Sequence, residues 1–124
     1  MRDSVRRRIR VMVVRRRLEE TAASLVESAT GTRPGSHSVV ARRLMLLPAH
    51  ARDDRWSDLL GLARRASRVY ELTSAVLHSN RAFGDVPEHL VQEWEQTAAE
   101  AADAVQDRTR PGITLAPSSR SSAR

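Results

Sequence analysis

Apolar residues recur every three or four positions in residues 4–29, which is the spacing of one face of an α-helix. A short β-strand is the alternative for residues 9–13, because Ile9, Val11 and Val13 are β-branched and alternate with other residues. The stripe continues well past this segment, so we predict one helix, ended by Gly31 in a left-handed conformation. The predicted buried stripe consists of Val11, Val14, Leu18, Ala22, Leu25 and Ala29.

The first turns of this helix carry a second apolar face. At about 100° per residue, Val5, Ile9, Met12 and Val13 fall on the side opposite the stripe. A helix packed on a single core does not need this face. We therefore expect a second copy, a partner protein or another element of the fold to cover it, and these four residues are the candidate partner-binding site.

The segment after this helix predicts a linker and a short second helix. Residues 30–37, TGTRPGSH, are rich in Gly, Pro and Ser and are typical of a linker. Ser38 is a suitable cap for a helix over residues 39–47, and Pro48 is expected to stop it because proline has no backbone donor. The buried positions of this helix are predicted to be Val40, Leu44 and Leu47.

Two long helices are predicted next, over residues 54–79 and 86–107, joined as an antiparallel hairpin. Asp53 or Asp54 is expected to cap the first, and Asp85 with Glu88 resembles a capping box for the second. The predicted core of the first is Leu59, Leu62, Ala66, Val69, Thr73 and Val76, flanked by Trp56, Leu60, Tyr70 and Leu77. For the second, the predicted core is Leu90, Trp94, Ala98, Ala101 and Val105, with Glu93, Glu95, Glu100 and Asp103 facing outward.

These elements predict an all-α fold, a small helical bundle built on the antiparallel hairpin. Residues 1–107 are expected to form a single helical domain that contains the linker at 30–37. Residues 108–124 are rich in Arg, Ser and Pro with little to bury, so we expect a disordered tail.

Charge is distributed unevenly along the chain. All 21 basic residues are Arg, and the net charge of the 124 residues is +6. Residues 1–52 hold twelve Arg and four acids, whereas residues 53–107 hold five Arg and eleven acids. One consequence is that the basic first helix is able to dock on the acidic last helix, within one copy or between two.

The composition excludes several chemistries. The chain has no Cys, which rules out disulfides and thiolate sites, and its apolar runs are shorter than the roughly 20 residues of a spanning helix. His89 and Glu93 lie one helical turn apart, with His78 before the hairpin, but this is a poor zinc signature. No Gly-rich phosphate loop or nucleophile motif is present. We expect a cytoplasmic protein that is not an enzyme and has no cofactor or metal.

Two function classes follow. The leading hypothesis is a non-catalytic interaction or adaptor module that self-associates through the second face of its first helix. The alternative is a nucleic-acid-binding protein that neutralises phosphates with an arginine-rich helix. Aromatic residues for base stacking are scarce, and a basic helix lying on a membrane surface is a third, weaker possibility. The arginines of the alternative are Arg6, Arg7, Arg8, Arg10, Arg15, Arg16 and Arg17.

Overall fold

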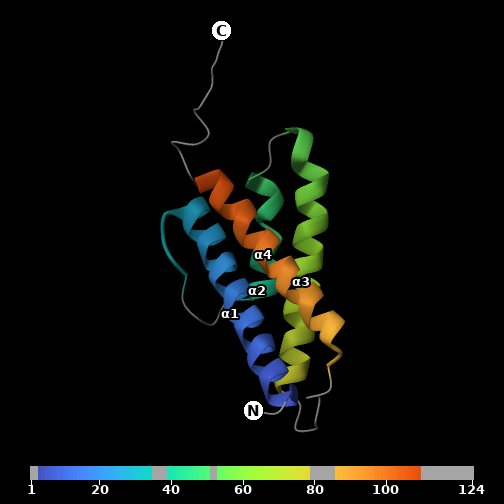
Figure 1. The fold of residues 1–124 in the computed structure, drawn as a ribbon. Coiled ribbons are helices and arrows are strands. Elements are labelled where there is room, and N and C mark those ends of the chain that lie inside the picture. Colours follow the sequence, from blue (N-terminus) through green and yellow to red (C-terminus); the bar gives the residue numbers. More distant parts are fainter. Residues whose placement is uncertain (1–2, 35–38, 51–52, 79–85, 110–124) are drawn as a thin grey trace.

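Helices make up the regular structure in the part of the chain that the structure describes. This computed structural model describes residues 3–34, 39–50, 53–78 and 86–109, and no strand occurs in these ranges. The all-α prediction is confirmed (Figure 1). In chain order the elements are α1 (Asp3–Thr30), α2 (Val40–Leu44), the 3₁₀ helices η1 (Leu47–His50) and η2 (Asp53–Arg55), α3 (Trp56–His78) and α4 (Glu88–Thr109).

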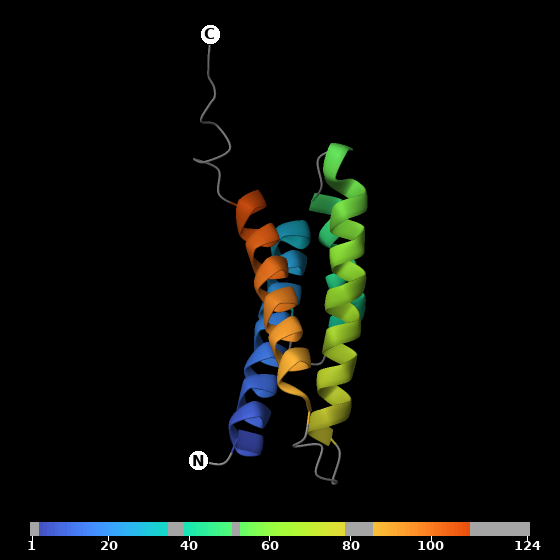
Figure 2. The ribbon, with the colours of Figure 1, turned by 45° about the vertical axis from the view of Figure 1, so that its right-hand side comes forward.

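The three long helices pack along one another. Helices α1 and α4 lie side by side and run in the same direction, while α3 runs the opposite way (Figures 1 and 2). The short α2 packs against both α1 and α3, and η1 packs against α3 and α4. This arrangement places the acidic α4 against the basic α1.

The core consists of one face from each long helix. On α1 the predicted stripe from Val11 to Leu25 is buried, whereas Ala29 is exposed in the last turn. All six predicted core residues of α3 are buried, as are the three of the short-helix segment. On α4 the prediction is one residue off at the start, because Val91 is fully buried and Leu90 only partly. Four further predicted residues of α4 are buried, Trp94, Ala98, Ala101 and Val105, and Thr97, which was not predicted, is buried as well.

The end of α1 is formed as predicted by Gly31. This glycine has a φ of +79°, and its backbone N–H donates to the carbonyl of Glu27 at 2.8 Å. The left-handed conformation closes the helix with a single such bond, and a side chain at this position would be strained.

The second helix is shorter than predicted. It ends at Leu44, because the N–H groups of Met45 and Leu46 bond to the carbonyls three residues back and tighten the chain into 3₁₀ turns. Pro48 follows inside η1, where its missing donor is tolerated. Val39 occupies the N-cap without a capping side chain, and the predicted cap, Ser38, lies outside the described residues.

The bounds of the long helices also differ from the prediction. Helix α4 starts after Pro87, whose carbonyl accepts from the N–H groups of Leu90 and Val91, and extends to Thr109, two residues into the predicted tail. Helix α3 starts at Trp56, which is 53% exposed instead of flanking the core. Residues 79–85, which include the predicted hairpin turn and Asp85 of the predicted capping box, and residues 110–124 lie outside the described residues. No helix in the described ranges meets the length and hydropathy needed to cross a membrane.

Candidate functional site

The four residues on the second face of α1 form an exposed apolar surface, here called the outer patch. The exposed fractions are 47% for Val5, 43% for Ile9, 51% for Met12 and 52% for Val13. Their spacings of three and four make them neighbours on the helix surface. They lie opposite the buried stripe, as the periodicity predicts, and no described element of the fold covers them.

Three arginines border the outer patch. Arg16 and Arg17 follow Met12 and Val13 by four residues, so they lie at its C-terminal end, and Arg6 precedes Ile9 by three residues. All three side chains are exposed. Within the described part of the chain, none of them makes a hydrogen bond or an ion pair. The border of the patch is therefore positively charged and available to a partner.

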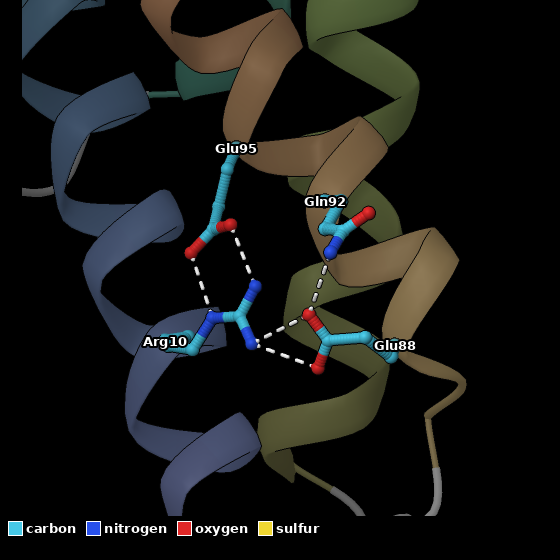
Figure 3. A network of polar contacts seen from close by, with 4 residues as sticks. All are labelled: Arg10, Glu88, Gln92 and Glu95. Carbon is cyan, nitrogen blue, oxygen red and sulfur yellow. Dashed lines mark hydrogen bonds and ion pairs between the residues drawn. The ribbon is translucent and has the colours of Figure 1, made fainter.

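Arg10 points toward α4 and joins α1 to it (Figure 3). Its Nε and Nη2 donate to the two carboxylate oxygens of Glu95 at 2.9 and 2.8 Å. Its Nη1 donates to both oxygens of Glu88, at 2.8 and 2.9 Å. Gln92 donates to the same Glu88 carboxylate at 3.0 Å. The planar guanidinium is suited to such paired bonds, so this site realises the predicted docking of α1 on α4 within one copy.

The contact with Arg10 changes the acidity of Glu95. The hydrogen bonds from Arg10 hold the pKa of Glu95 below its usual value, more strongly than partial burial raises it, and the positive charge of Arg17 acts in the same direction. In return, the bonds to Glu95 and then those to Glu88 raise the pKa of Arg10. The pair therefore stays ionised when the solution becomes mildly acidic.

Arg15 and Arg8 are held on α3. Arg15 lies over the ring of Tyr70, 5.2 Å from its centre, and its Nη2 donates to the Tyr70 hydroxyl at 3.2 Å. That hydroxyl donates to Glu19 at 3.2 Å, and Glu19 is 3.5 Å from the Arg15 Nε. Arg8 donates to the carbonyl of Leu77 at 3.1 Å. This carbonyl lies in the last turn of α3, where backbone acceptors have no partner within the helix.

The seven arginines of the predicted nucleic-acid site are thus divided by the fold. Arg8, Arg10 and Arg15 bind groups of α3 and α4. Arg7 is partly buried, and its Nε is enclosed without a hydrogen-bond partner among the described residues. The exposed members are those that border the outer patch: Arg6, Arg16 and Arg17.

The predicted outer acidic face of α4 is only partly outward. Glu93 and Asp103 are exposed, whereas Glu95 turns toward α1 and Glu100 lies 3.4 Å from Arg65 of α3. His89 and Glu93 are both exposed on α4, and His78 is exposed at the end of α3. In the described ranges, no three His, Asp or Glu side chains are grouped closely enough to hold a metal ion.

The surface of α1 is chemically suited to two kinds of contact. The outer patch offers apolar side chains, and its border offers guanidinium groups that pair with carboxylates or phosphates. Neither contact provides a nucleophile or a proton-transfer group. Comparisons of this chain with protein-family models, with curated proteins and with solved structures found no match.

Proposed function

We propose that this protein is a non-catalytic interaction module whose outer patch binds a helix of another protein molecule. The supporting observation is that four neighbouring apolar side chains on α1 remain about half exposed, although the opposite face of the same helix is fully buried. Contiguous exposed apolar patches of more than a few hundred Å² are uncommon on monomers and mark interaction sites. Burying it contributes roughly 25 cal/mol per Å².

The shape of the patch favours a helical partner. Val5, Ile9 and Met12 follow spacings of four and three, so their side chains form a ridge along α1. Val13 lies beside Ile9 and widens this ridge. Ridges of this kind pack into the grooves of another helix, and amphipathic helices are bound in this way.

A library of displayed amphipathic helical peptides tests the proposal. The library fixes apolar residues at spacings of three and four and varies the remaining positions among acidic, basic and neutral residues. We expect the full chain to enrich binders, and the variant Ile9→Asp/Met12→Asp to lose them. The matched control is Leu72→Asp, because Leu72 is also exposed but lies on α3. Circular dichroism checks that each variant keeps its helices.

Two results of this selection would contradict the proposal. Binders that the Ile9→Asp/Met12→Asp variant retains would assign the interaction to another surface. An absence of any enriched helix would remove the proposal itself.

The proposed partner helix could belong to a second copy of this chain. Light-scattering mass after size exclusion tests it, with wild type compared with Ile9→Asp/Met12→Asp. A dimer that becomes a monomer in the variant supports self-association. A monomer at the highest soluble concentration excludes a second copy and leaves other proteins as partners.

Nucleic-acid binding is the second candidate, because Arg6, Arg16 and Arg17 are exposed and make no hydrogen bond or ion pair in the described part of the chain. Each neutralised phosphate contributes about −0.9 to the salt slope, so three arginines predict a slope of about −3. Binding of duplex DNA that is lost in Arg6→Glu/Arg16→Glu and survives in Ile9→Asp/Met12→Asp would replace the first proposal.

A further inference from the structure

We infer that the helix bound by the outer patch is acidic, with carboxylates beside its apolar row, and belongs to a different protein. This inference rests on the proposed function and specifies the chemistry of the partner. Two observations support it. Exposed arginines border the patch, and the other arginines of α1 that form contacts, Arg8, Arg10 and Arg15, are bound to groups of α3 and α4.

The carboxylates near α1 are mostly engaged within the chain. Glu19 contacts Arg15 and Tyr70, and Glu20 pairs with Arg33. Glu27 also binds Arg33, at 2.8 Å. On the neighbouring α4, Glu88 and Glu95 are occupied by Arg10. Glu95 also lies within the electrostatic reach of Arg17. Arg6 and Arg16 make no hydrogen bond or ion pair in the described part of the chain, so these acids do not compensate them.

The positions of these arginines specify where a partner places its acids. Arg16 and Arg17 lie at the C-terminal end of the patch, and Arg6 lies along one side near its start. Residues 5–17 extend over about 18 Å, or three helical turns. A partner helix therefore needs an apolar row of about three turns, with carboxylates at the end that meets Arg16.

A second copy is a poor electrostatic match for this surface. In a parallel pair Arg16 lies beside its own equivalent. In an antiparallel pair centred between Ile9 and Met12, Arg16 and Arg17 of one copy approach Arg6 of the other. Like charges in contact oppose association, whereas an acidic helix replaces the repulsion with ion pairs. Charge complementarity thus favours a heterologous acidic partner.

An anionic membrane is also complementary in charge, but the patch is poorly built for lipid. None of its four residues is aromatic, and interfacial helices commonly use Trp or Phe as anchors. Arg16 also lies in line with Val5 and Met12, not confined to a separate polar face. The composition of the patch therefore favours a protein helix over lipid.

Three labelled peptides of about 20 residues, long enough to form helix in water, test the inference. All share Leu at spacings of three and four, and they carry Glu, Gln or Lys beside the Leu row. Fluorescence anisotropy measures their binding to the full chain. We expect the Glu peptide to bind on the order of tenfold more tightly than the Gln peptide, because exposed ion pairs each contribute modestly. The Lys peptide is expected to bind most weakly, and salt should reduce the difference.

Charge reversal supplies the decisive comparison. In Arg6→Glu/Arg16→Glu the order of the Glu and Lys peptides should invert, and Arg6→Gln/Arg16→Gln should remove the preference without adding negative charge. The matched control is Arg64→Glu/Arg68→Glu, because both arginines are exposed on α3 and make no hydrogen bond or ion pair with α1 in the described part of the chain. This control should keep the original order.

Each remaining outcome has a clear meaning. Equal binding of the three peptides overturns the inference and leaves the proposed function standing, whereas binding of none contradicts both. A dimer that Ile9→Asp/Met12→Asp dissolves identifies a second copy and overturns the inference. The inference is also overturned if phosphatidylserine vesicles bind the wild type, fail to bind Ile9→Asp/Met12→Asp, and displace the Glu peptide.

Discussion

The contact between Arg10 of α1 and Glu95 of α4 yields a quantitative prediction. Replacing Arg10 by Gln removes a guanidinium that donates two hydrogen bonds to Glu95 and two to Glu88, all between 2.8 and 2.9 Å. Gln retains much of the aliphatic stem and some capacity to donate. The perturbation is therefore mainly the loss of the charge and of the paired geometry.

The magnitude follows from the exposure of the three side chains. Arg10 is 27% exposed, Glu95 38% and Glu88 46%, so water still screens both ion pairs. Exposed pairs typically contribute 0.2–1 kcal/mol each, and a bidentate arginine lies toward the upper end. We expect Arg10→Gln to lower the free energy of unfolding by about 1–1.5 kcal/mol. The two glutamates remain hydrated in the variant, which avoids the larger cost of a buried unpaired charge.

A double-mutant cycle isolates the pair. Arg10→Gln, Glu95→Gln and the double variant are unfolded with urea and followed by circular dichroism. The coupling free energy is expected to be about 0.5–1 kcal/mol. Arg16→Gln is the control, since Arg16 is exposed without a partner among the described residues and should change stability by less than about 0.5 kcal/mol. A coupling near zero, or an equal loss from Arg16→Gln, would refute the assignment of Arg10 to the α1–α4 contact.

Three other predictions test the fold. Because the pKa of Glu95 is lower in the folded chain than its usual 4.5, its contribution to stability is present above that pH and is lost as the pH falls below it. The difference in stability between wild type and Glu95→Gln should therefore shrink below pH 4.5, and a constant difference contradicts this. Leu18→Ala should lower the free energy of unfolding, measured with urea, by about 2–5 kcal/mol, since Leu18 is fully buried. A loss below about 1 kcal/mol would contradict the position of Leu18 in the core. Trp94→Ala should cost about 3–5 kcal/mol and Trp56→Ala less than about 0.5 kcal/mol, because the first is buried and the second exposed; acrylamide should quench Trp56 preferentially.

The helices and most of the core were predictable because helical periodicity depends only on local spacing. The errors lie where another element decides the geometry. Trp56 lies in the first turn of α3, three residues before Leu59 and seven before Ala63, so it shares their face but is 53% exposed. Local spacing gives the face of a residue but not how far the neighbouring elements extend along the helix. Leu90 and Val91 are neighbours in the first turn after Pro87, and only the packing of α4 on the other helices selects Val91 as the buried one.

The division of the arginines was less accessible from the sequence. Seven arginines within twelve residues suggest one basic surface, but a helix distributes them around its axis. The spacing of Glu88, Gln92 and Glu95 places three polar residues on one face of α4, and this pattern could have predicted a binding face for an arginine. What the sequence did not contain is the parallel alignment of α1 and α4 that brings Arg10 to this face.

The inner and outer faces of α1 meet different requirements. On the inner face, buried residues such as Val11, Leu18 and Leu25 fix how the helix sits on the core, and Arg10 holds one flank to α4. Polar residues at positions 5, 9, 12 and 13 would leave these contacts intact, because the existing side chains contact solvent for about half of their surface. Apolar residues there add little to the stability of the described fold and increase the tendency to associate. Under the proposed function these side chains serve a contact outside the folded chain, and the exposed arginines beside them, Arg6 and Arg16, are the reason to propose an acidic partner.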